Sequence, residues 1–250
     1  MINTIKARMQ QKNRTIGFPD TEPVLPDRFR GAPALDSAKC DRSCDACAKV
    51  CPVNAITTQP KPQLDIGACL FCGECADACP THALSFTNDY RLAVRKREDM
   101  LFGGDPVRLA AAFDAKVRTL FGRSLKLRQV SAGGCNACEA DINVLNTVVF
   151  GLGRFGIQFV ASPRHADGVV VTGPISRNME LGLRKTWNAI PDPKIAIAVG
   201  ACAISGGPFS GHAEVTDGIA SIIPVDLFVP GCPPHPLTIL DGLLRVLGRR

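Results

Sequence analysis

The sequence predicts two domains in succession: an α+β domain over residues 39–104 and an α/β domain with a doubly wound parallel sheet over residues 125–250. Two observations predict this division. A cysteine-rich stretch is repeated inside the first segment, and short apolar stretches alternate with helical patterns throughout the second. Strands that alternate with helices are typical of parallel sheets with helices packed on their faces.

Residues 1–38 are rich in proline and charged residues, and we expect them to form an extended arm. The basic start of the chain lacks the apolar stretch of a signal peptide. No run approaches the roughly 18 apolar residues that a membrane-spanning helix needs. These features predict a cytoplasmic protein, in which clustered cysteines bind metals or serve redox chemistry more often than they form disulfides.

The first domain contains a repeat with a period of 28 residues. Its two copies read C-x3-C-x2-C-x3-C-P and C-x2-C-x2-C-x3-C-P, the pattern of bacterial ferredoxins. In that pattern the fourth cysteine of each run ligates the other cluster. The spacing therefore predicts two 4Fe–4S clusters, the first held by Cys40, Cys44, Cys47 and Cys79, and the second by Cys69, Cys72, Cys75 and Cys51.

Cys40 departs from the repeat because it lies one residue earlier than Cys69 would require. It is therefore the weakest of the predicted ligands. Zinc is the alternative occupant, since C-x-x-C pairs also bind zinc. Zinc takes four ligands for each ion, and zinc sites do not require an eight-cysteine repeat closed twice by Cys-Pro.

Residues 105–124 predict a helix that links the two domains. Asp105 is a suitable N-cap, Pro106 suits the first turn, and Gly122 can end the helix. Apolar residues recur along one face of it, namely Leu109, Phe113, Val117 and Leu120.

In the second domain we expect five strands and three helices. The strands lie at residues 125–130, 156–160, 168–173, 194–200 and 225–230, and the helices at 138–150, 176–190 and 236–248. Sites in such sheets form in the loops beyond the carboxyl ends of the strands. The four remaining cysteines, Cys135, Cys138, Cys202 and Cys232, follow predicted strands. Twelve cysteines thus divide into three sets of four, which predicts a third 4Fe–4S cluster.

Glycines accompany the cysteines of the third set. We expect Gly133, Gly134, Gly200 and Gly231 to let the backbone turn tightly and approach the cluster. Glu139 lies at a helix start, where the helix dipole alone favours an acid; the alternative is that Glu139 tunes the cluster or lies on a proton route. The glycines form no G-x-G-x-x-G pattern, so nothing favours NAD binding.

The excess positive charge is concentrated between the domains. Residues 91–128 contain ten Lys or Arg against four Asp or Glu, and this difference equals the net charge of +6 of the whole chain. Such a stretch is a solvated connector or a docking surface for an acidic partner or anionic lipid. A nucleic-acid partner is not favoured, because neither interleaved aromatic residues nor a known motif accompanies the charge.

Several stretches carry a resemblance to known families. GGCNACEADI, DPKIAIAVGACAISGGPF and VDLFVPGCPPHPLTIL resemble the small subunit of group 4 membrane-bound NiFe hydrogenases, including formate hydrogenlyase, and the related 20 kDa subunit of NADH:quinone oxidoreductase. The C-x-x-C spacing and His235 favour the hydrogenase branch. PVLPDRFRGAP, the cysteine repeat and NDYRLAVRKREDML resemble the ferredoxin subunit of the same complexes.

The resemblance implies a ferredoxin-like domain followed by a flavodoxin-like domain, and an electron-transfer subunit that is not catalytic alone. It implies a large-subunit partner, either NiFe-containing or complex I-like, further membrane-embedded subunits, and a soluble electron donor. The chain would then lie on the inner face of the cell membrane through its partners. The alternatives are a complex I-like NADH- or quinone-linked module and a zinc-binding interaction module.

Overall fold

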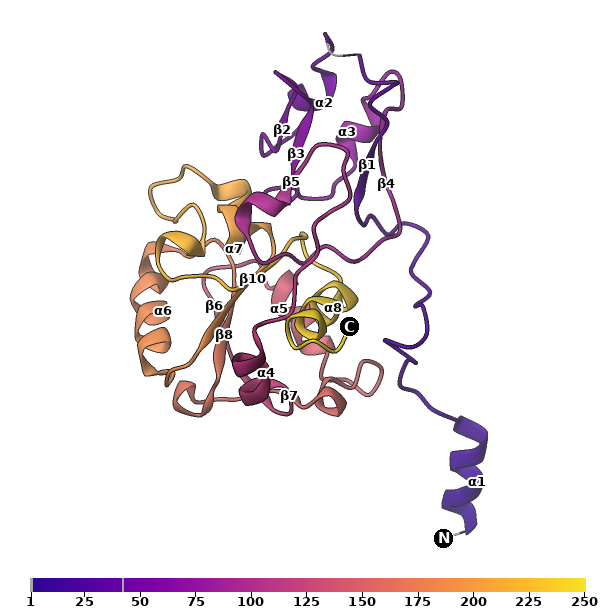
Figure 1. Ribbon diagram of the computed structural model, residues 1–250, viewed down its shortest axis with the longest axis vertical. Helices are drawn as coiled ribbons and strands as arrows, with labels where there is room; N and C mark the ends of the chain where they lie inside the picture. The colour runs from indigo at the N-terminus through magenta and orange to yellow at the C-terminus, as the bar shows by residue number, and fades with distance from the viewer. Residues whose placement is uncertain (1, 42) are drawn as a thin grey trace.

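The computed structural model describes residues 2–41 and 43–250, and its largest element is a parallel five-stranded sheet (Figure 1). The strands are β6 Leu125–Ser131, β7 Ile157–Phe159, β8 Gly168–Thr172, β9 Ile195–Val199 and β10 Leu227–Val229. They lie in the order β10-β9-β8-β6-β7, and every neighbouring pair is parallel. Counted within this domain, the order is 2-1-3-4-5 from β7, which flavodoxin-like sheets also have. The predicted parallel α/β sheet is confirmed.

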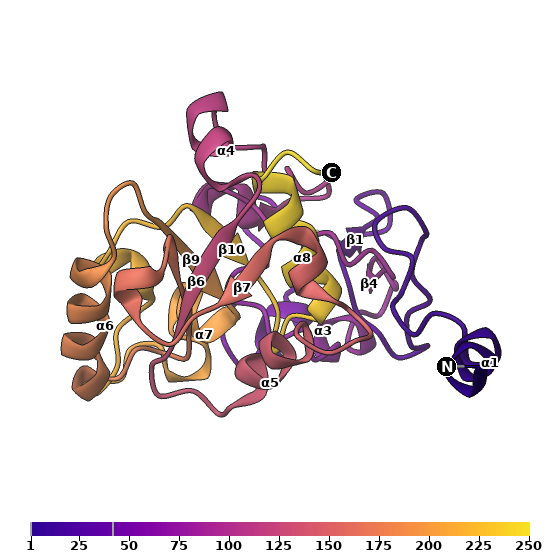
Figure 2. The same cartoon turned by 90° about the horizontal axis from the view of Figure 1, so that it is seen from below.

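Helices cover both faces of this sheet, and alternate residues of each strand supply the two faces. Val169 and Val171 of β8 pack in one core with α6 Arg177–Ala189 and α7 Ala201–Ser205. Val170 lies in the other core, with α5 Ala137–Val144 and α8 Pro236–Val246. Figure 2 shows α6 and α8 on opposite sides of the sheet. Strands buried on both faces explain why β9 is apolar throughout and why β8 is apolar up to the buried Thr172 at its end.

The smaller domain preserves the 28-residue period in its elements. Its two short helices, α2 Ala46–Lys49 and α3 Glu74–Asp77, occupy equivalent positions of the repeat. The strands β2 Ile56–Thr57 and β4 Leu84–Phe86 are equivalent in the same way. β2 pairs with β3 Gln63–Asp65, which also pairs with β5 Leu101–Phe102; β4 pairs with β1 Pro33–Leu35. The cysteine repeat therefore corresponds to two similar half-domains.

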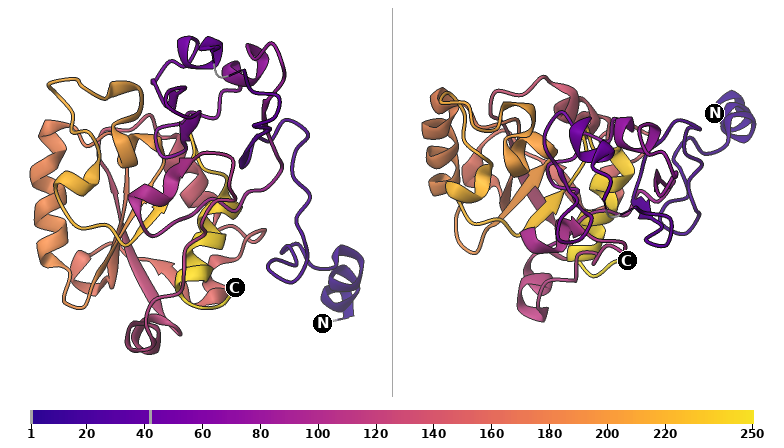
Figure 3. Two further views of the ribbon diagram at one scale, coloured as in Figure 1. Left: turned by 45° about the horizontal axis from the view of Figure 1, so that its top comes forward. Right: turned by 90° about the horizontal axis from the view of Figure 1, so that it is seen from above.

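The arm over residues 1–38 is not extended throughout. Residues Ile2–Gln11 form α1, which projects away from the rest of the molecule in Figures 1 and 3. Ala, Arg, Met, Gln and Lys dominate this segment, and all of them favour helix. At the other end of the arm, β1 completes a sheet of the smaller domain.

The predicted linker helix is wrong over its first half. The helix α4 covers only Ala115–Phe121, and its N-cap is Asp114, not Asp105. Residues 105–114 are not helical because their backbone bonds to the α/β domain: Ala110 N donates to Ala93 O at 2.7 Å and Phe113 N to Val246 O at 2.9 Å. Tertiary contacts thus replace the internal hydrogen bonds of a helix. The helix expected at 138–150 is also shorter, since α5 ends at Val144.

The two domains share one core instead of meeting across a flexible joint. Ile66 and Met100 of the smaller domain lie in the same buried cluster as Val169 and Val171 of the sheet. Val94 exchanges backbone hydrogen bonds of 3.0 and 2.8 Å with Phe228 of β10. The smaller domain thereby lies over the carboxyl edge of the sheet (Figure 3). A domain boundary at residue 104 would separate residues 90–94 from the α/β domain, although these residues pack against it.

Gly242→Ala tests the packing of residues 90–94 against α8. A Cβ added at Gly242 of α8 would lie 2.6 Å from the Cβ of the buried Ala93. Helix propensity favours alanine by about 1 kcal/mol, but overpacking costs about 1–3 kcal/mol. We therefore expect a lower thermal midpoint of unfolding, restored in part by adding Ala93→Gly. A stabilised Gly242→Ala variant would contradict the close packing of residue 93 against α8.

Candidate metal centres

The first predicted set of cysteines lines one cavity of the smaller domain. Cys40, Cys44 and Cys47 come from the first half of the repeat, and Cys79 reaches the same cavity from the second half. Burial raises the pKa of Cys47. Burial alone would also raise the pKa of Cys79, but hydrogen bonds from Leu84, Thr81 and Ala83 outweigh it and lower that pKa.

The second set lines a separate cavity in the reciprocal manner. Cys69, Cys72 and Cys75 meet Cys51, which comes from the first half of the repeat. Burial raises the pKa of Cys69 to about 12 and that of Cys75 to about 11, and nearby thiolate charges of the same set act in the same direction. The structure thus brings together both sets with the crossed membership that the repeat predicts.

Backbone N–H groups point at these sulfurs. Ala55 N donates to Cys51 Sγ at 3.2 Å, and Ala83 N donates to Cys79 Sγ at 3.3 Å. The two alanines are equivalent positions of the repeat, so both crossing cysteines receive the same hydrogen bond. Phe71 N donates to Cys69 Sγ at 3.3 Å. Four thiols around each cavity with N–H donors directed at sulfur are the donor set that suits a 4Fe–4S cluster, and hydrogen bonds to sulfur tune its potential.

The third set converges at the carboxyl edge of the large sheet. Cys135 lies in the loop between β6 and α5, Cys138 lies in the first turn of α5, Cys202 lies in α7 after β9, and Cys232 follows β10. Burial raises the pKa of Cys138, with smaller contributions from Glu139, Cys202 and Cys232. Burial likewise raises the pKa of Cys202 to about 11. Cys135 and Cys232 are exposed, so one side of this site faces outward.

Two of the four predicted glycines have a clear steric role in this site. Gly200 has φ +90°, and a Cβ there would lie 2.6 Å from Cys138 Sγ. Gly231 has φ +147°, and a Cβ there would lie 2.4 Å from Pro234 Cα, so the tight turn around Cys232 leaves no room for a side chain. Gly133 and Gly134 lie farther back, where the atoms nearest to an added Cβ belong to Ser176 and Glu139.

Glu139 is held by two hydroxyl groups that sequence reasoning missed. Its side chain is 6% exposed. Ser131 Oγ and Thr172 Oγ1 donate to Glu139 Oε1 at 2.5 and 2.6 Å. Ser131 and Thr172 are partners in the β6–β8 register at the carboxyl ends of those strands. The sequence carried one signal for this pair, because Ser131 and Thr172 are hydroxyl residues at the ends of two predicted strands. Burial alone would raise the pKa of Glu139, but these hydrogen bonds outweigh it and lower the pKa.

The second and third sites adjoin each other. After burial and Cys135, the next contribution that raises the pKa of Cys232 comes from the charge of Cys72. Cys72 and Cys232 are both exposed and belong to different sets. The first and second cavities share the lining residues Ile56 and Leu64, so the second site adjoins both of the others.

The crossed membership predicts different effects for two matched variants. Cys51→Ser should disturb the second site, and Cys79→Ser the first, although each cysteine lies in the other half of the repeat. Each variant should lose up to about four iron atoms by the ligation rule. Only Cys51→Ser should abolish magnetic interaction with the third site in electron paramagnetic resonance (EPR) spectra. Equal effects of the two variants on that interaction would contradict the assignment.

Thr172→Val tests the support of Glu139. Because the folded-state pKa of Glu139 lies below its ordinary 4.5, its charge stabilises the fold above that pH, and this stabilisation is lost as the pH falls through the folded value. Loss of one hydrogen bond to a buried charge should cost about 1.5–3 kcal/mol at pH 7. This loss of stability should be smaller at a pH below the folded-state pKa of Glu139 than at pH 7, and thermal denaturation at both pH values would measure the difference. Thr172→Ser keeps the hydroxyl and is the control; equal losses in both variants would contradict this role.

Comparisons with known proteins match both halves of the chain. Residues 135–246 match the family model described as NADH ubiquinone oxidoreductase, 20 Kd subunit, and residues 39–83 match the 4Fe-4S dicluster domain. No helix in the described part of the chain, residues 2–41 and 43–250, is long and apolar enough to cross a membrane.

Curated relatives resemble about half of the chain. Formate hydrogenlyase subunit 7 of Escherichia coli (strain K12) is 42% identical over 138 residues, which cover 55% of this chain and 54% of that protein. The probable membrane-bound hydrogenase subunit mbhJ of Pyrococcus furiosus is 41% identical over 133 residues, covering 53% of this chain and 80% of that protein. The chain therefore spans about half the length of the first relative and most of the second.

An NADH-quinone oxidoreductase subunit from Desulfovibrio desulfuricans is 42% identical over 113 residues, which cover 45% of this chain and 61% of that protein. Among solved structures, a chain of the membrane-bound sulfane sulfur reductase, an archaeal respiratory membrane complex, matches 54% of this chain and 75% of its own length, with 28% identity and a TM-score of 0.48. By its 41% identity to the Pyrococcus protein, of which it covers 80%, and by its match to the family model, the chain belongs to the family of the 20 kDa subunit of NADH ubiquinone oxidoreductase, preceded here by a 4Fe-4S dicluster domain.

Proposed function

We propose that the chain is an iron–sulfur electron-transfer subunit of a multisubunit hydrogenase-like oxidoreductase and holds three 4Fe–4S clusters in series. The observation that carries this proposal is the grouping of twelve thiols into three adjoining sets of four. Bound clusters would accept and release single electrons. The protein's own contribution is to fix the spacing, burial and hydrogen bonding of the cysteine sets.

The first two sets lie in what we infer to be a ferredoxin-like domain. The crossing cysteines Cys51 and Cys79 and their equivalent N–H donors support this assignment. A soluble electron donor would exchange electrons at the first site, which lies farthest along the series from the third. From a different class, a zinc-binding interaction module would use the same C-x-x-C pairs but gains nothing from the crossed sets.

The third site is the one we assign to a catalytic partner. Cys135 and Cys232 are exposed there, and glycine and proline line the surrounding loops, so this surface would be left open without a second protein. We infer that a hydrogenase-type large subunit, NiFe-containing or complex I-like, covers it. Further membrane-embedded subunits would then hold the chain peripherally at the cytoplasmic face of the membrane.

The second candidate function is a complex I-like NADH- or quinone-linked module. The likeness to the NADH-quinone oxidoreductase subunit of Desulfovibrio desulfuricans supports it. The C-x-x-C spacing of Cys135 and Cys138 favours the hydrogenase-like function. The large subunit that co-purifies with this chain distinguishes the two, because a nickel site needs paired C-x-x-C motifs in that partner.

Cys138→Ser in the intact complex tests the proposal. Cys138 is partly buried against the core of the α/β domain, away from the exposed partner-facing thiols Cys135 and Cys232, so its loss should slow electron transfer to the partner while assembly of the complex stays unchanged. The measurement is turnover of the complex with an artificial electron donor, with Ser162→Ala, in the loop after β7, as the control. Unchanged turnover in Cys138→Ser would remove the third site from the electron path. Turnover of hydrogen or quinone by the isolated chain would contradict the need for a catalytic partner.

A further inference from the structure

The segment from Thr15 to Ala32, which we call the strap, contacts both domains although it contains no helix or strand. At its start, Thr15 Oγ1 donates to Val148 O at 2.7 Å in the loop after α5 of the α/β domain. Ile16 N donates to Val149 O in the same loop, at 2.9 Å. The strap thus begins as an attachment to the large domain.

Phe18 anchors the strap in the core of that domain. Its side chain is 2% exposed and meets the Tyr90 ring edge to face, with ring centroids 6.1 Å apart. The guanidinium of Arg250 lies 4.9 Å from the centre of the Phe18 ring, and Arg154 Nη2 donates to Phe18 O at 2.6 Å. The aromatic side chain is therefore enclosed on several sides.

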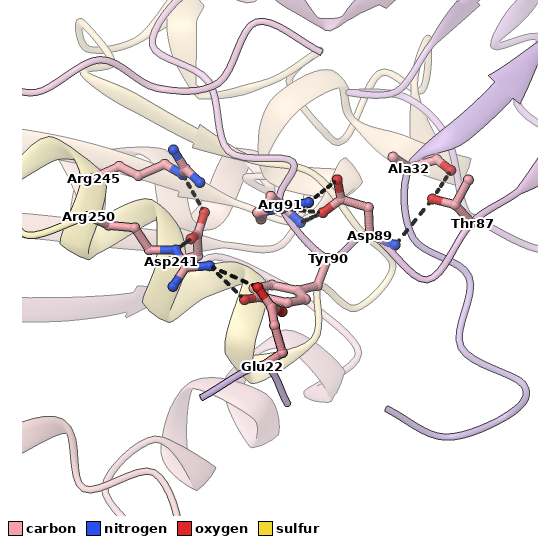
Figure 4. Close-up of polar contacts among 9 residues, drawn as sticks. All are labelled: Glu22, Ala32, Thr87, Asp89, Tyr90, Arg91, Asp241, Arg245 and Arg250. Atoms are coloured by element: carbon pink, nitrogen blue, oxygen red, sulfur yellow. Dashed lines mark hydrogen bonds and ion pairs between the residues drawn. The ribbon is translucent and has the colours of Figure 1, made fainter. Parts of the chain in front are cut away.

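Arg250 is itself held in place by buried and half-buried groups. Figure 4 shows it between Asp241 of α8 and the hydroxyl of Tyr90. Its Nε lies 2.6 Å from Oδ1 of Asp241, whose side chain is fully buried, in an ion pair without hydrogen-bond geometry. Its Nη1 donates to Pro19 O of the strap at 3.1 Å.

The other end of the strap belongs to the smaller domain. Gly31 N donates to Thr87 O, and Ala32 N donates to Asp89 O, both at 2.7 Å. Thr87 Oγ1 returns a hydrogen bond to Ala32 O at 2.9 Å, as Figure 4 shows. The chain then enters β1, which pairs with β4.

Between these attachments, consecutive strap residues touch the loops of two different cysteine sites. The Phe29 ring lies edge-on to His235, 5.4 Å between centroids, three residues after Cys232 of the third site. Arg30 packs against Gly73, which follows Cys72 of the second site; a Cβ on Gly73 would lie 2.7 Å from Arg30 Nε. One short stretch of backbone therefore bridges the two adjoining sites.

The strap complements the shared core, which joins the domains elsewhere. Gly67 of the smaller domain packs against Ile204 of α7. In Figure 1, α7 lies below one side of the smaller domain, whereas the strap reaches that domain on the other side, beside β1. The strap therefore adds a separate attachment to the shared core and to the Val94–Phe228 hydrogen bonds.

We propose that the strap fixes the separation of the second and third cysteine sites, with Phe18 as its positioning residue. The inference rests on the proposed function, because electron tunnelling between clusters falls steeply with distance. One electron would leave the second site and arrive at the third without any bond being made or broken. The strap acts on this step only through geometry.

The test uses the full chain, anaerobically reconstituted, with a recognition sequence for a site-specific protease inserted after Val24, which is fully exposed. The same protein before cutting is the matched control. Because both samples have the same sequence and fold before the protease is added, a folding defect of a variant cannot explain a difference between them. Two quantities are measured before and after cutting: hydrogen exchange of the amides at residues 71–75 and at Gly231, Cys232 and His235, and the magnetic splitting between the reduced second and third clusters in EPR spectra. Iron content is measured in parallel.

We expect cutting to speed hydrogen exchange in both loops and to abolish the resolved splitting, with the iron content unchanged. Phe18→Ala should also speed hydrogen exchange and abolish the splitting. Phe18→Leu should keep most of the behaviour of the uncut protein, and Val24→Ala should change neither measurement. Unchanged exchange and splitting after complete cutting would overturn the proposal. So would loss of iron on cutting, because the strap would then hold a site together instead of spacing two sites. A chain that binds no cluster defeats the proposed function, while hydrogen exchange still decides the role of the strap.

Discussion

Convergence of thiols from distant parts of the chain is the constraint on which the rest of the structure depends. Each cysteine set needs at least one member from another element: Cys79 and Cys51 cross between half-domains, and the third set draws on three strand ends. A tight backbone is required at each meeting point. Gly200 leaves room for the Cys138 sulfur, and residues 90–94 bind the smaller domain to the sheet. The shared core includes Cys69 and Cys75, so the same packing that joins the domains also fixes the second set relative to the sheet.

Burial and hydrogen bonding have opposite effects on the pKa values of the thiols, and their balance differs among the three sites. Burial raises the pKa of the thiols Cys69, Cys138 and Cys202, so metal binding there must displace protons. N–H groups from Ala55, Ala83 and Phe71 offset part of that cost for sulfur in the first two sites. In the third site the nearby Glu139 carboxylate adds negative charge, and two hydroxyls keep that carboxylate in a fixed position.

Sequence reasoning could predict the cysteine sets and the strands, because both depend on local pattern. The spacing of the repeat specifies which cysteines cross, and continuous apolar runs such as residues 195–199 mark strands buried on both faces. It could not predict where contacts between distant segments override local preference. Residues 105–114 have a helical pattern but bond to Ala93 and Val246 instead. Phe18 packs against Tyr90, and Thr172 donates to Glu139, 33 residues away in the sequence. No local pattern reveals partners at such separations.

Cluster stoichiometry tests the central claim most directly. Native mass spectrometry of the chain, purified without oxygen from cells that assemble it, measures which inorganic atoms are bound and how many. We expect about twelve iron and twelve sulfide per chain, four of each for every set of cysteines. A protein that carries zinc without sulfide, or that saturates reproducibly with two clusters, would contradict three clusters in series.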